Sequence, residues 1–97
     1  MENPLHDEDA GSFALPPLLD LTAAEPLHRA LVEHARTGDP LVVTGSSVVR
    51  VSTAAVQILL AAAADARARG TSFRLRDPSP ELTDALTDLG VESHFGL

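Results

Sequence analysis

The feature that most constrains this chain is a repeated order of segments. Three times, a short β-forming segment is followed by a helical pattern that ends at a glycine. Consecutive strands joined by a helix run parallel, because a tight turn can join only antiparallel strands. The order predicts an α/β domain with a mixed, mostly parallel sheet of four to five strands and about three to four helices. The expected strands are 18–21, 41–44, 48–51 and 71–76, the expected helices are 22–37, 53–69 and 80–89, and the closing glycines are Gly38, Gly70 and Gly90.

Local signals give the expected helix starts. Thr22 and Glu25 stand three apart, which is the spacing of a capping box and predicts that the first helix begins there. Ser52 precedes the long second helix as a candidate N-cap. Ser79 followed by Pro80 predicts the start of the third helix, since proline is well tolerated at a first helical position. Residues 41–44 and 48–51 are read either as one bent strand or as two.

Length, charge and cysteine content limit the classes of protein to which the chain can belong. Its 97 residues fit one domain, which we place at 13–97, after an acidic segment, 1–12, that we expect to be disordered. The net charge of −7 disfavours nucleic acids and anionic membrane surfaces as partners. No cysteine is present, which fits the reducing cytoplasm. The longest apolar stretch, 54–64, contains Gln57 and is shorter than the roughly 20 residues of a membrane span, so we expect no membrane insertion.

No catalytic or metal-binding pattern is found. His28 and His34 are six residues apart, so they are expected on different helix faces and not as a ligand pair. The chain has no phosphate-binding glycine loop and no nucleophile elbow. We therefore predict no enzyme, no cofactor and no metal site. The alternative kept is an enzyme or small-ligand binder with a pocket that no motif reveals. An acidic stripe on the third helix is interpreted as a solvated face; it consists of Glu81, Asp84 and Asp88.

Three segments together resemble the STAS domain family, which includes the bacterial anti-sigma factor antagonists. They are residues 50–60, 66–70 and 78–82. In that family, a strand ends in an Asp-Ser-Ser-Gly or Asp-Thr-Ala-Gly type of loop that opens a long helix. Here Ser52 stands at the position of the Asp, Thr53 at that of the phosphorylatable residue, and Ala55 at that of the Gly. The missing acidic residue makes the chain similar to a divergent subset that includes the small STAS subunit of the Mla phospholipid-transport complex.

The resemblance implies a protein–protein interaction module and leaves two partner classes open. One is an anti-sigma or kinase-like signalling protein, controlled by phosphorylation of Thr53 or, second, of Ser52. The alternative is the ATPase of a phospholipid ABC transporter, bound by an Mla-like accessory subunit. In either case the loop and the start of the long helix are expected to bind the partner. Gln57 is included among the partner-binding residues because it is the lone polar side chain in the apolar stretch 54–64. The predicted partner-binding residues are Ser52, Thr53, Ala54, Ala55 and Gln57.

Overall fold

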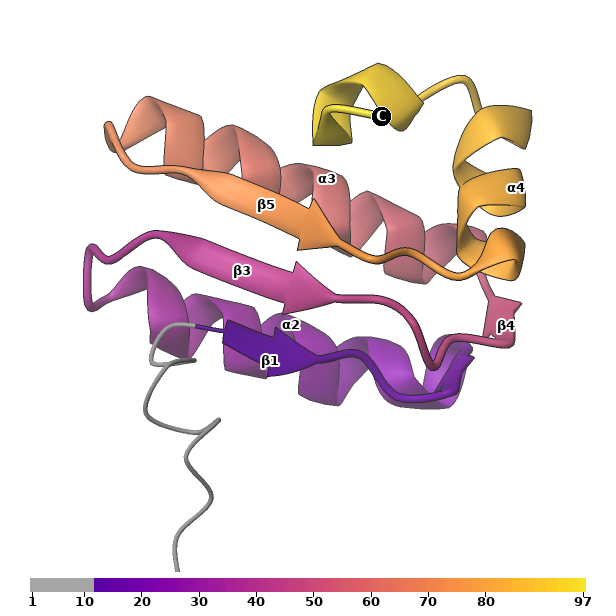
Figure 1. The fold of residues 1–97 in the computed structure, drawn as a ribbon. Coiled ribbons are helices and arrows are strands. Elements are labelled where there is room, and N and C mark those ends of the chain that lie inside the picture. The colour runs from indigo at the N-terminus through magenta and orange to yellow at the C-terminus, as the bar shows by residue number, and fades with distance from the viewer. Residues whose placement is uncertain (1–11) are drawn as a thin grey trace, which may run out of the picture.

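The computed structural model describes residues 12–97, which form two parallel sheets (Figure 1). The larger sheet has the order β1-β3-β5, and a smaller sheet pairs β2 with β4. The predicted acidic segment lies outside the described residues except for Ser12, which begins β1. The strands are β1 (Ser12–Ala14), β2 (Leu18–Leu19), β3 (Leu41–Thr44), β4 (Arg50–Val51) and β5 (Phe73–Arg76).

The expected single sheet of four to five strands is divided, and every strand pair among residues 12–97 is parallel. Pro16 and Pro17 lie between β1 and β2 and have no N–H to donate to a neighbouring strand. On the adjacent segment, a turn closed by Val48 N–H to the Gly45 carbonyl (3.3 Å) separates β3 from β4. The segment 41–51 is therefore two strands.

Three α-helices and one short 3-10 helix lie within residues 12–97. Ser52 and Ser79 are confirmed as N-caps. The Ser52 hydroxyl accepts a hydrogen bond from Ala55 N–H, and the Ser79 hydroxyl accepts one from Leu82 N–H, each at 3.1 Å. The predicted capping box at Thr22 is wrong. Asp20, which directly follows β2, caps this helix instead and accepts from Ala23 N–H at 3.2 Å. Aspartate is a better N-cap than threonine. The helices are α2 (Leu21–Ala35), α3 (Thr53–Ala68), α4 (Pro80–Asp88) and η1 (Glu92–Phe95).

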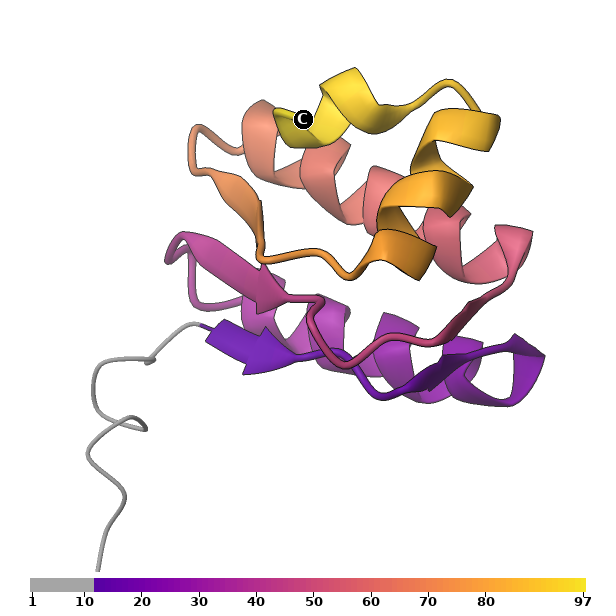
Figure 2. The ribbon, with the colours of Figure 1, turned by 45° about the vertical axis from the view of Figure 1, so that its right-hand side comes forward.

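One face of the larger sheet is covered by α2 and α3, which lie side by side behind it (Figures 1 and 2). The core fills the space between these layers, with α4 and η1 closing one end. Phe73 of β5 and Phe95 of η1 contribute a tilted ring pair with centroids 5.9 Å apart. Largest among the fully buried side chains are Leu15, Leu19, Val43, Val48, Val56, Leu59, Leu82 and Leu86.

Candidate functional site

Ser52 connects β4 to α3, and its polar groups are already in use. Its N–H donates to the Leu19 carbonyl at 2.7 Å, and its carbonyl accepts from Val56 N–H at 3.2 Å. Its half-buried hydroxyl accepts from Ala55 N–H. A modification of this hydroxyl would remove the helix cap, so Ser52 is the poorer of the two candidate acceptors.

Thr53 is the first residue of α3, and its side chain is exposed. Ser52 satisfies the N–H groups of Ala55 and Val56, but the described residues supply no acceptor for those of Thr53 and Ala54. These two N–H groups and the helix dipole would favour an anion at this position. The threonine is therefore accessible and lies in a local field that suits a phosphate.

The other predicted partner-binding residues are placed differently from one another. Gln57 is exposed one helical turn after Thr53, on the same side of α3. Ala54 is half-buried. Ala55 is fully buried and belongs to the hydrophobic core, so its side chain cannot contact a partner. Its methyl group points into the domain, and the alanine that replaces the family's glycine therefore leaves the outer surface of the loop unchanged.

Three exposed apolar residues next to this loop are absent from the sequence-based candidates. Leu18, Leu21 and Val49 have 50%, 73% and 56% of their surface exposed. For Leu18, strand periodicity contained the signal, because Leu19 is buried and its neighbour in β2 must face the other way.

The segments that carry these residues, namely β2, the start of α2 and the stretch before β4, lie at the end of the molecule where α2 and α3 both begin (Figure 1). Val49 N–H donates to the Pro17 carbonyl at 2.8 Å, which holds Val49 beside the residue that precedes Leu18. Leu18 itself is in register with Arg50, which is also exposed. Leu19 and Val51 are paired, so Leu21 and Thr53, each two residues further on, start adjacent helices. We call this region the loop surface; it consists of Leu18, Leu21, Val49, Thr53 and Gln57.

The acidic stripe is exposed as predicted, and it lies outside the loop surface. Glu81, Asp84 and Asp88 are on the solvent side of α4, a helix that packs beside β4. The ion pairs found within residues 12–97 involve other residues: Arg29–Glu25 at 3.3 Å and Arg69–Asp65 at 2.9 Å.

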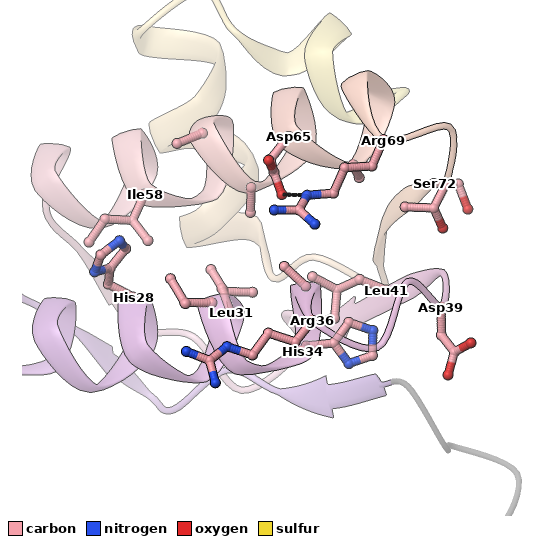
Figure 3. A pocket seen from close by; sticks show the side chains of 16 residues that line it. His28, Leu31, His34, Arg36, Asp39, Leu41, Ile58, Asp65, Arg69 and Ser72 are labelled. Carbon is pink, nitrogen blue, oxygen red and sulfur yellow. Dashed lines mark hydrogen bonds and ion pairs between the residues drawn. The ribbon is translucent and has the colours of Figure 1, made fainter.

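A groove of about 340 Å³ runs between α2 and α3 (Figure 3), and neither Thr53 nor Gln57 is among the residues that line it. Its floor includes Leu31 and Ile58, and the Asp65–Arg69 ion pair lies on its rim. His28 and His34, which we expected on different helix faces, both line it. Within residues 12–97, however, no three His, Asp or Glu side chains come together as metal ligands would.

The loop, the helix that follows it and the parallel β-α order define a class of small interaction domains. A family model described as "Mlab, STAS domain" matches residues 8–96. The chain belongs to the STAS domain family, whose members act as protein-interaction modules. A comparison with curated proteins found no match. In the described part of the chain, no helix has the length and apolarity needed to cross a bilayer.

Proposed function

We propose that this chain is a bacterial, cytoplasmic, non-catalytic accessory subunit that binds the ATPase of an Mla-like phospholipid ABC transporter through the loop surface. The observation that carries this proposal is the exposure of three large apolar side chains around the free start of α3. Single exposed apolar residues are ordinary, but a group of them around a family's characteristic loop is typical of a docking site.

The composition of the loop surface supports a long-lived complex. Leu18, Leu21 and Val49 supply apolar area, and stable interfaces are richer in such area than transient ones. Thr53 and Gln57 add two uncharged polar groups, which can hydrogen-bond to a partner without the desolvation cost of a charge. No carboxylate is part of this surface, although the chain has 14 Asp and Glu residues.

The choice of a transporter ATPase rests on Ser52 and on the matching family model. The family's signalling members carry an acidic residue where this chain has Ser52, whereas the Mla-type subset departs from that pattern. The description of the family model names Mlab. Ser52 keeps the helix cap without adding charge, which supports constitutive docking.

A second candidate function is that of an anti-sigma factor antagonist, with phosphorylation of Thr53 as the switch. The exposed hydroxyl of Thr53 and the free N–H groups beside it favour this candidate. A phosphate there would be stabilised by the helix dipole but would add about −1.5 to −2 charges beside the apolar side chains of the loop surface.

Co-purification tests the proposal and separates the two candidates. The tagged full chain, expressed in its own host, should retain an ABC-transporter ATPase through size-exclusion chromatography, identified by mass spectrometry. Thr53→Glu should remove the ATPase from the complex, since it places a charge at a desolvated interface, whereas Thr53→Ala should retain it. Stable recovery of an anti-sigma factor or a kinase-like protein, with Thr53 phosphorylated, would establish the second candidate and refute the first.

A further inference from the structure

The larger sheet has one face that no described helix covers. Both α2 and α3 lie on the same side of it, and the opposite side is open in both views (Figures 1 and 2). Leu41, Val43 and Leu75 point toward the helices and are buried. Their neighbours must point to the open side because side chains alternate along a strand.

The open face has small side chains in its middle and arginines along one edge. Val42 of β3 is in register with Arg74 of β5, and Thr44 with Arg76. Ala14 of β1 is in register with Thr44 on the other side. Ala14 and the two arginines are exposed, while Val42 and Thr44 are half-buried. The face is thus flat and uncharged over β1 and β3, with two cations on β5.

A parallel sheet with one face that no described helix covers is expected to bind another element on that face. Parallel sheets are nearly always covered on both faces, and solenoid folds with an open parallel sheet use that surface for binding. The described ion pairs do not include Arg74 or Arg76, although the chain has only seven basic residues against 14 acidic ones. The carboxylate next to them in the sequence, Asp77, is exposed and forms no ion pair within the described residues.

Two other occupants fit less well. A second copy packed sheet to sheet about a two-fold axis perpendicular to the strands would stack β5 on β5 and bring four arginines together, and like charges in one interface repel. About an axis parallel to the strands, each pair of arginines would face the uncharged Ala14 strand of the other copy, which offers them no carboxylate. The acidic stripe of a second copy has suitable charge, but the exposed Leu89 beside it is a single apolar side chain at the end of a short helix and does not cover both Val42 and Ala14. A partner with both features fits better.

We propose that the open face binds an amphipathic helix of a partner protein, with small apolar residues over β1 and β3 and a row of carboxylates along β5. The dimensions agree: three strands span about 10 Å between the outer two, close to the 10–12 Å diameter of one helix. Arg74 and Arg76 are about 6.6 Å apart along the strand, and helix residues four apart rise by about 6 Å. Each guanidinium can therefore meet one carboxylate of an i, i+4 pair.

The probe for this proposal is a hydrocarbon-stapled helical peptide, with Ala and Leu on one face and two glutamates four residues apart at its edge. Titrated into the ¹⁵N-labelled full chain, it should shift amide signals of β3 and β5. The double variant Arg74→Glu, Arg76→Glu should weaken binding by about tenfold or more, from two charge-assisted pairs. The matched control, Arg36→Glu with Arg67→Glu, makes the same change in net charge on α2 and α3 and should retain the affinity. A peptide with lysines in place of the glutamates should bind the Arg74, Arg76 variant better than the parent chain.

Three kinds of result would overturn the proposal. In the first, the peptide does not bind. In the second, both double variants lose affinity equally, or the signals that shift belong to the loop surface. In the third, the peptide binds only after removal of residues 1–11, which would make the chain's own acidic segment the occupant. The open face and the loop surface are different parts of the molecule, so a negative result for this peptide would leave the proposed function untouched, and the reverse also holds.

Discussion

Replacing Ser52 by alanine tests whether this residue is a structural cap or part of a chemical switch. The Ser52 hydroxyl accepts the Ala55 N–H at 3.1 Å in a half-buried position, and alanine leaves that N–H without its partner. Loss of a serine N-cap costs about 1 kcal/mol of unfolding free energy, within a range of roughly 0.5–2. For a domain of this size that corresponds to a decrease in Tm of about 4–8 °C.

Two matched variants isolate the cap. Ser52→Asp restores the side-chain acceptor and adds a charge that the helix N-terminus stabilises, so its stability should lie within about 0.5 kcal/mol of the parent. Thr53→Ala removes an exposed hydroxyl for which no hydrogen bond is found in the described residues, and it should change stability by less than about 0.5 kcal/mol.

Urea unfolding followed by far-UV circular dichroism measures these differences. With a slope of about 1–2 kcal/mol per molar urea, the Ser52→Ala midpoint should decrease by about 0.5–1 M, and the other two midpoints should remain near the parent value. Equal losses for Ser52→Ala and Thr53→Ala would refute the assignment of the cap to Ser52. A Ser52→Asp variant as unstable as Ser52→Ala would show that an acidic residue cannot take over this position.

Two further substitutions test the packing of the core. Gly45→Ala should destabilise the fold by about 1–3 kcal/mol in the same assay, because the new Cβ would lie 2.6 Å from Cδ2 of the fully buried Leu82; unchanged stability would show that Leu82 can move aside. Phe95→Ala should lower the free energy of unfolding by about 3 kcal/mol or more, because it removes a buried ring that packs on Phe73. The control Leu97→Ala, at a position 47% exposed, should lower it by less than about 0.5 kcal/mol. Similar losses for the two variants would contradict the docking of η1 into the core.

Much of the fold could be predicted because its signals are local. Serine caps, closing glycines and apolar spacing depend on a few neighbouring residues, and the second and third helices were placed within one residue of their observed ends. The predicted start of α2 is one residue too late because Asp20, expected inside the preceding strand, caps the helix in place of Thr22, and that role depends on where β2 ends.

The division of the sheet and the contents of the loop surface were harder to predict. Whether Pro16 and Pro17 interrupt one sheet or end an edge strand depends on the turn at Gly45, which is far away in the sequence. The burial of Ala55 depends on which way α3 faces the sheet, and all sides of its alanine-rich run look alike in the sequence. Exposed apolar residues such as Leu21 are recognised only when the core is known to be filled without them.

The affinity of the ATPase partner for two sets of variants tests the central claim most directly. Gln57→Arg places a charge within the loop surface, and it should weaken the complex at least about 100-fold while the urea midpoint stays near that of the parent chain. Reversal of Glu81, Asp84 and Asp88 to lysine should change mainly the association rate, and that change should fade at high salt. Normal binding by Gln57→Arg, together with loss of the complex on reversal of the acidic stripe, would place the interface on α4 and contradict the account.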